Sequence, residues 1–218
     1  MISYIKIAIL FIAVLLISGK KVHGQGTAGV IDKGKIYTNL YEAKVSPLAV
    51  YKLDLSNLPV DSFPIDLSAF KNLEYLSLNN SHLEFIPREI DNLGNLKVLH
   101  LSGGDFKALP ADFSKLKNLE EIYINVNKNI DFSQTVQVLS TLPGLRTLHL
   151  DNNGIAKLPS NFGNLVQLQK LYLNQNKFDE VPPEIQGLKN LQYLDMKGNQ
   201  IPLRQQVNYK TFGVKVAF

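Results

Sequence analysis

The sequence predicts an α/β solenoid with seven short parallel strands along one face. A unit exemplified by residues 145–167, LRTLHLDNNGIAKLPSNFGNLVQ, recurs with spacings of 23, 23, 23, 26, 23 and 23 residues between successive starts. Apolar residues at the fourth and sixth positions of most units alternate with polar ones, as in a short strand with one buried face. Because a single unit cannot bury its own apolar side, stacked copies must share one core.

The repeats divide the chain into four predicted segments. The seven units begin at Val50, Leu73, Leu96, Leu119, Leu145, Leu168 and Leu191. We expect a signal peptide over residues 1–24, a flexible lead-in and N-terminal cap over residues 25–49, repeats over residues 50–202, and a C-terminal cap over residues 203–218.

The amino terminus has the pattern of a secretory signal. Lys6 precedes an apolar run from Ile7 to Ile17, which is shorter than the roughly 20 residues that span a bilayer core. We expect cleavage before Gln25 and export to the periplasm, the cell surface or the medium. Lys20 and Lys21 follow the run directly, so an uncleaved anchor is the alternative. After cleavage, no stable membrane insertion is expected.

Charge and cysteine content exclude several classes of function. The signal segment carries three of the 23 basic residues and no acidic ones, so the mature chain has 20 basic against 19 acidic residues. A nearly neutral protein lacks the electrostatic attraction that drives nucleic-acid binding. There is no cysteine, which rules out a disulfide framework, a thiolate zinc site, a cysteine nucleophile and a lipid-modified cysteine.

The segment before the first repeat predicts a cap. Residues 25–36 are rich in glycine and small side chains and indicate a flexible lead-in. Asn39 with Glu42 three residues later resembles a capping box, and Leu40 to Val45 can form a short helix that Pro47 stops. Such a cap covers the core edge that the first coil would otherwise expose to water.

Asparagine at the ninth position predicts a buried hydrogen-bonded turn. A buried Asn can satisfy backbone groups of its own turn and of the neighbouring coil. It occurs in the last four units, at Asn127, Asn153, Asn176 and Asn199. The first three units have Leu58, Ser81 and Gly104 instead, so we expect a weaker ladder at the amino end.

The second half of each unit predicts a short helical turn on the outer side. Proline followed by apolar residues three and six positions later suits a helical or 3-10 turn whose apolar side enters the core. The pairs are Phe63-Pro64, Ile86-Pro87, Leu109-Pro110, Leu158-Pro159 and Val181-Pro182.

The fourth unit, residues 119–144, is longer and lacks such a pair at the usual place. Asp131 with Gln134 predicts the start of an α-helix of about three turns that ends near Pro143. The resulting bulge suits a docking site or a tolerated insertion. At the end of the chain, Val214 and Val216 alternate with Lys215 and predict a closing strand or cap.

The consensus LxxLxLxxNxLxxLPxxIxxLxN over residues 50–202 resembles the leucine-rich repeat family, in the 23-residue subclass of bacterial and plant intracellular Ras-group-related proteins. The resemblance implies parallel strands on a concave face and helical or extended segments on the convex face. Cysteine-rich caps of extracellular animal members are absent, so secreted bacterial members are the better match. The family binds proteins or other large ligands and seldom performs chemistry, which implies no enzyme activity and no cofactor.

Solvent-facing strand positions form columns in which a ligand site can be sought. The fifth-position column contains His100, Tyr123, His149 and Tyr172, and aromatic side chains with polar tips are enriched at binding surfaces. The candidate ligand-binding set is His100, Tyr123, His149, Tyr172, Tyr75, Tyr193, Asp151 and Lys170. The alternative is that tyrosine and threonine simply suit strands.

Spacing argues against metal binding and catalysis on this face. Two strand steps place His100 and His149 about 10 Å apart, whereas zinc ligands must converge on one ion. Asp151 or Ser102 beside a histidine lacks an oxyanion donor and a complete triad. Two hypotheses remain: a module that binds a protein or glycan, or a structural or adhesive surface component without one specific ligand.

Overall fold

A computed structural model describes residues 31–58, 66–204 and 213–218. The predicted signal peptide and the Phe63-Pro64 pair lie outside the described residues. The chain divides into two compact units, residues 1–31 and 32–218, and all seven repeats belong to the second. Within the described ranges, no helix combines the length and apolar character needed to cross a membrane.

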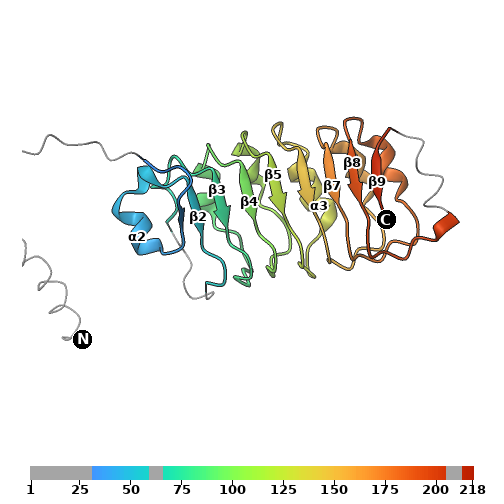
Figure 1. The fold of residues 1–218 in the computed structure, drawn as a ribbon, viewed down its shortest axis with the longest axis horizontal. Helices are drawn as coiled ribbons and strands as arrows, with labels where there is room; N and C mark the ends of the chain where they lie inside the picture. The colour runs from blue at the N-terminus through green and yellow to red at the C-terminus, as the bar shows by residue number, and fades with distance from the viewer. Residues whose placement is uncertain (1–30, 59–65, 205–212) are drawn as a thin grey trace, which may run out of the picture. The chain divides into compact units, whose positions relative to one another are not determined.

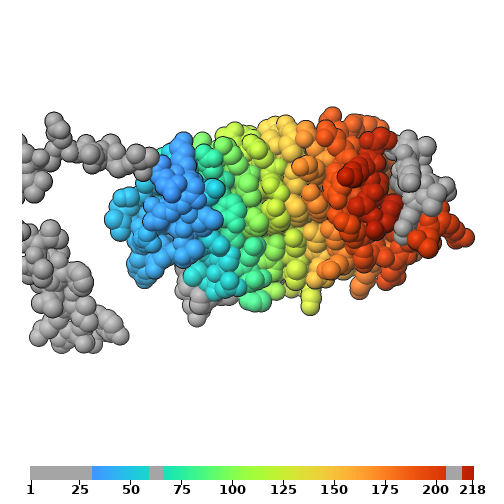
Figure 2. Space-filling view, in the orientation of Figure 1, coloured from blue at the N-terminus to red at the C-terminus, as the bar shows by residue number. Residues whose placement is uncertain are grey.

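The repeats form one parallel sheet, which has nine strands in the described part of the chain and follows chain order throughout (Figure 1). The seven predicted strands are β2 (Lys52–Asp54), β3 (Tyr75–Ser77), β4 (Val98–His100), β5 (Glu121–Tyr123), β6 (Thr147–His149), β7 (Lys170–Tyr172) and β8 (Tyr193–Asp195). Two strands extend the sheet at its ends, β1 (Ile36–Tyr37) and β9 (Lys215–Ala217). Figure 2 shows the colours of successive coils following one another as bands, as expected when each coil contacts its neighbours.

Strand β1 corrects the predicted lead-in at its carboxyl end. Ile36 pairs with Lys52 of β2 rather than belonging to a flexible segment. Lys35 fixes this strand against the cap, because its Nζ lies 2.7 Å from Glu42 Oε1 and 4.2 Å from the ring centre of Tyr37. The strand covers backbone groups that β2 would otherwise leave at an open sheet edge.

The predicted N-terminal cap helix is confirmed as α2 (Leu40–Val45). Asn39 Oδ1 accepts hydrogen bonds from the backbone N–H groups of Tyr41 at 2.9 Å and Glu42 at 3.3 Å. The Glu42 carboxylate pairs with Lys35, so only the asparagine half of the capping box is seen. A one-turn 3-10 helix, η2 (Pro47–Ala49), then leads into β2.

Apolar positions of the repeat build one continuous core. In the fifth unit Leu145, Leu148 and Leu150 are 0%, 0% and 1% exposed. Phe162 enters the same core from the convex side and is fully buried. Since burying one such side chain contributes about 1.5–3 kcal/mol, the stacked units supply the stability that a single unit lacks.

The predicted turns after the prolines are 3-10 helices. Those in the described residues are η4 (Arg88–Asn92), η5 (Ala111–Lys115), η6 (Ser160–Asn164) and η7 (Pro183–Gly187). Each has proline as its N-cap, with φ between −56° and −69°, the angle that proline imposes. Ile90, Phe113 and Phe162 point inward from these turns, whereas Ile185 is only partly buried.

The long fourth unit contains α3 (Phe132–Leu139), which packs between η5 and η6. Asp131 caps it by accepting from the N–H groups of Ser133 and Gln134. With eight residues the helix is shorter than the predicted three turns to Pro143. It ends where Ser140 Oγ and Thr141 Oγ1 donate to carbonyl groups three residues back, at 2.8 and 2.7 Å, because such bonds compete with helix continuation.

The asparagine ladder is confirmed. Asn153 Oδ1 accepts from the Asn127 N–H at 2.7 Å, and its Nδ2 donates to the Ile124 carbonyl at 2.8 Å. Asn176 repeats this pattern toward Asn153. At the amino end Ser81 Oγ reaches its two carbonyl partners only at 3.4 Å, so the ladder is weaker there, as expected.

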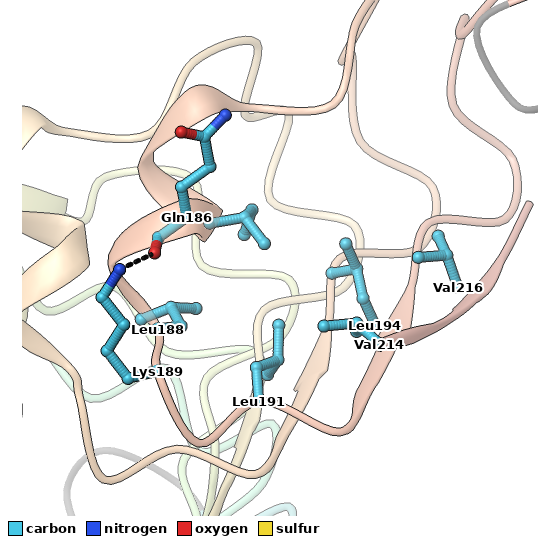
Figure 3. Close-up of a pocket in the computed structure, with 8 residues that line it drawn as sticks. Gln186, Leu188, Lys189, Leu191, Leu194, Val214 and Val216 are labelled. Atoms are coloured by element: carbon cyan, nitrogen blue, oxygen red, sulfur yellow. Dashed lines mark hydrogen bonds between the residues drawn. The ribbon is translucent and has the colours of Figure 1, made fainter. Parts of the chain in front are cut away.

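A cavity of about 320 Å³ lies beneath the closing strand β9 (Figure 3). It is lined mainly by apolar side chains of the last coil and of the segment around β9, including Ile185, Leu188, Leu194 and Val216. Lys189 at the cavity donates to the Gln186 carbonyl oxygen at 2.9 Å. Because Leu194 and Tyr193 are successive strand residues, this cavity belongs to the core side of the sheet, opposite the solvent-facing columns.

Candidate ligand-binding face

Four aromatic rings stack on one another across strands β4 to β7. His100, Tyr123, His149 and Tyr172 occupy equivalent positions in adjacent strands because the parallel pairing is in register. Their successive centroids are 3.9, 3.8 and 4.2 Å apart, with interplanar angles of 9°, 8° and 7°. The predicted column is therefore a continuous stack and not a set of separate side chains.

Two tyrosines close the ends of this stack. Tyr75 of β3 lies against His100 with centroids 5.2 Å apart and a tilt of 53°. Tyr193 of β8 lies against Tyr172 at 5.5 Å and 54°. Both come from the third-position column and lean over, because Ser77 and Asp195 occupy the fifth position in those strands. We call these six residues the aromatic row: Tyr75, His100, Tyr123, His149, Tyr172 and Tyr193.

Glu121 ties the centre of the aromatic row together. Its Oε1 accepts from the Tyr123 hydroxyl at 2.8 Å and lies 2.8 Å from His149 Nε2. Because an ionised carboxylate only accepts, Nε2 must donate. Glu121 occupies the third position of its unit and is absent from the ligand-binding set predicted from the sequence. The sequence signal that could have indicated its role is an acidic residue two positions before Tyr123, on the strand next to that of His149.

Burial keeps the stacked rings uncharged at neutral pH. Burial lowers the pKa of His149 below that of a free histidine, and the bond to Glu121 only partly opposes this. Burial likewise lowers the pKa of His100. The pKa of Tyr123 is raised first by burial and then by its bond to Glu121. The row therefore presents neutral imidazole and phenol groups.

A second hydrogen-bond ladder runs beside the row in the seventh-position column. Asn125 Oδ1 accepts from the Asp151 N–H, and Asp151 Oδ1 accepts from the Asn174 N–H, both at 2.7 Å. The same bond, from a seventh-position side chain to the backbone of the next coil, also joins Asn79 to Ser102, Ser102 to Asn125, and Asn174 to Lys197. One oxygen of the candidate residue Asp151 is thus committed to the fold.

The eighth position of every unit adopts left-handed backbone geometry. The residues are Asn57, Asn80, Gly103, Val126, Asn152, Gln175 and Gly198, with φ between 54° and 70°. Among the described residues Val126 is the one β-branched side chain with positive φ, and it is 44% exposed. This conformation costs an L-residue roughly 1–2 kcal/mol, so Val126 introduces strain next to the aromatic row.

The structure brings six of the eight candidate residues into contact as the aromatic row. Asp151 lies beside the row, two residues after His149, the last residue of β6. Lys170 begins β7 on the other side of the row, two residues before Tyr172, and is exposed. No ion pair to Lys170 is formed within the described residues.

The stack gives the two histidines no common coordination sphere, because the Tyr123 ring lies between them. Over the described ranges no group of three or more His, Cys, Asp or Glu side chains is placed to hold a metal ion. The chemistry available on this face is therefore hydrogen bonding, ion pairing and contact with aromatic edges.

Two family models, both described as leucine-rich repeat, match residues 143–201 and 72–93. A leucine-rich repeat protein of Leptospira interrogans is similar with a TM-score of 0.57 and 26% identity, over 84% of this chain and 57% of that chain. An internalin of Listeria monocytogenes matches with a TM-score of 0.56 and 23% identity, over 78% of this chain and 47% of that chain.

A Drosophila structure is similar at the level of fold. The Toll–Spatzle complex matches with a TM-score of 0.57 and 20% identity, over 71% of this chain and 21% of that chain. The chain thus spans less than two thirds of the length of each of these structures. No curated protein sequence matches it.

Proposed function

Because the chain belongs to the leucine-rich repeat family, we propose that it is an exported binding module that recognises a protein through the aromatic row. Repeats of this family commonly mediate protein interactions. One of the similar structures is a complex of Toll with Spatzle. No enzymatic step is part of the proposal.

The observation that carries the proposal is the row of six contacting rings on the solvent-facing side of the sheet, four of which stack in register. Tyrosine offers large rigid contact area with a polar tip and loses little conformational entropy on binding. Here the rings are already held by stacking and by Glu121, so binding needs little further ordering. A surface with only a structural role does not require a row of aligned and partly exposed aromatic rings.

Export is proposed from the amino-terminal pattern of Lys6 and the apolar run from Ile7 to Ile17. A cysteine-free chain folds equally well in an oxidising compartment. Mass spectrometry of protein recovered from the medium or cell surface tests this proposal. An amino terminus at Gln25 supports it, and an intact Met1 contradicts cleavage.

Affinity capture from the surface fraction and medium of the source cells tests the binding function. The full chain is compared with the Tyr123→Ala/Tyr172→Ala double variant and with Tyr41→Ala/Phe85→Ala. The control removes two aromatic rings that are 87% and 82% exposed and lie outside the aromatic row. We expect a protein captured by wild type and control but lost with the row variant. Equal capture by all three contradicts the proposal.

A further inference from the structure

The closed faces of the stacked rings limit what the aromatic row can recognise. Sugar rings bind aromatic side chains by packing against an open ring face. In the stack His100 to Tyr172 each inner face is covered by a neighbour at 3.8–4.2 Å, and the two outer faces meet Tyr75 and Tyr193. A ligand can therefore contact only the rims of these four rings, which carry the tyrosine hydroxyl groups and the histidine ring nitrogens.

Three polar groups of the aromatic row already have a hydrogen-bond partner. Glu121 Oε1 accepts hydrogen bonds from the Tyr123 hydroxyl and from His149 Nε2. Asp195 Oδ2 accepts a hydrogen bond from the Tyr193 hydroxyl at 3.0 Å. Within the described residues, the His100 ring and the Tyr172 hydroxyl form no side-chain hydrogen bond. Successive centroid distances of 3.9, 3.8 and 4.2 Å place the His100 and Tyr172 rings at most about 12 Å apart, which an extended peptide covers with about four residues.

Lys170 adds a positive charge near Tyr172, and no salt bridge to it is formed within the described residues. It lies on β7 two residues before Tyr172, so both side chains leave the same face of the sheet about 7 Å apart along the strand. Burial is the main cause of the lowered pKa of His149, and the charge of Lys170 adds a smaller lowering, so this charge acts on the row. By contrast, Lys197 on the same face already has Asp195 at 3.5 Å.

We propose that the aromatic row binds an extended acidic segment of a protein partner, with a carboxylate of that segment held between Lys170 Nζ and the Tyr172 hydroxyl. This inference rests on the proposed binding function and specifies its ligand class. The segment crosses the strands along the rims, and the His100 ring meets one of its polar groups about four residues from the carboxylate. A carboxylate accepts from both an ammonium and a phenol, and such charge-assisted bonds are stronger than neutral ones.

A displayed library of random linear heptapeptides, panned on the full chain, is the probe. We expect enriched peptides to carry Asp or Glu at a constant position. The best peptide and its Glu→Gln (or Asp→Asn) analogue are then measured by fluorescence anisotropy. The proteins are wild type, Lys170→Met, Tyr172→Phe and the control Lys117→Met, which removes an exposed lysine from the segment after η5.

The expected result is about a tenfold weaker binding of the acidic peptide by Lys170→Met, a smaller loss with Tyr172→Phe, and no change with Lys117→Met. The neutral analogue should bind wild type and Lys170→Met equally, because the charge partner is then already missing. Peptides enriched without an acid, equal binding by Lys170→Met and Lys117→Met, or no enriched peptide each overturns the inference. In those cases a captured protein that is lost with Tyr123→Ala/Tyr172→Ala still supports the proposed function, so the two failures are distinguishable.

Discussion

The ninth-position ladder makes Asn153 more important for stability than the equivalent residue of the second unit. The Asn153→Ala substitution removes an acceptor 2.7 Å from the Asn127 N–H and a donor 2.8 Å from the Ile124 carbonyl. Both groups lie inside the stack of coils, and no other hydrogen bond to them is formed in the described part of the chain. The substitution therefore leaves one buried donor and one buried acceptor without a partner.

The size of the effect follows from these two groups. An unsatisfied buried polar group costs about 1–3 kcal/mol, so Asn153→Ala should lower the free energy of unfolding by about 4 kcal/mol. Ser81→Ala removes only bonds of 3.4 Å, and the Asn79 carbonyl keeps its bond from the Asn57 N–H at 2.8 Å. We expect a loss below about 1 kcal/mol there.

Urea unfolding of both variants and the wild type, followed by circular dichroism, measures the difference. In thermal melts the Asn153 variant should lose about 8–16 °C, since 1 kcal/mol shifts Tm by about 2–4 °C for a domain of this size. Equal losses at the two sites, or a loss at Asn153 below about 1 kcal/mol, refute the reasoning that the ladder stabilises mainly the carboxyl-terminal units.

Three further predictions concern backbone strain, pH and close packing. Val126→Asn should raise the free energy of unfolding by about 1 kcal/mol, and the reciprocal Asn152→Val should lower it similarly, because both residues have positive φ, 58° and 54°; a urea midpoint unchanged in both variants contradicts this. Because burial lowers the pKa of His149 below 6.5, the unfolded chain takes up the proton first, so stability present above about pH 6.5 is lost as pH falls. As the pH is lowered from about 8 to 5, the urea midpoint of wild type should therefore fall more steeply than that of His149→Phe. Parallel curves for the two proteins contradict a lowered pKa of His149 in the folded state. Gly187→Ala should destabilise by about 1–3 kcal/mol because its Cβ would lie 2.6 Å from the Gly163 Cα, while Gly94→Ala, with nothing within 4 Å, should not; equal melts show that the coils can shift apart.

The repeated strand pattern was sufficient to predict which residues share a column. Equivalent positions of successive units pair in the sheet, so His100, Tyr123 and His149 are neighbours even across the 26-residue unit. The sequence also predicted the caps Asn39 and Asp131, because N-cap chemistry is local. These features follow from short-range patterns.

Features that depend on side-chain direction could not be predicted in the same way. Column membership alone does not say that Tyr75 and Tyr193 lean from the third position onto the ends of the stack. Seventh-position residues such as Asp151 look solvent-facing by alternation, yet their oxygens accept from the next coil. The short strand β1 was missed because two residues carry no periodicity.

The dissociation constant of the captured protein partner, measured for wild type, Tyr123→Ala/Tyr172→Ala and Tyr41→Ala/Phe85→Ala, tests the binding role of the aromatic row most directly. Two central aromatic residues of an interface together contribute several kcal/mol, so the row variant should bind at least about a hundredfold more weakly while circular dichroism shows it folded. The control should bind like wild type. Unchanged affinity of a folded row variant would contradict recognition through this face.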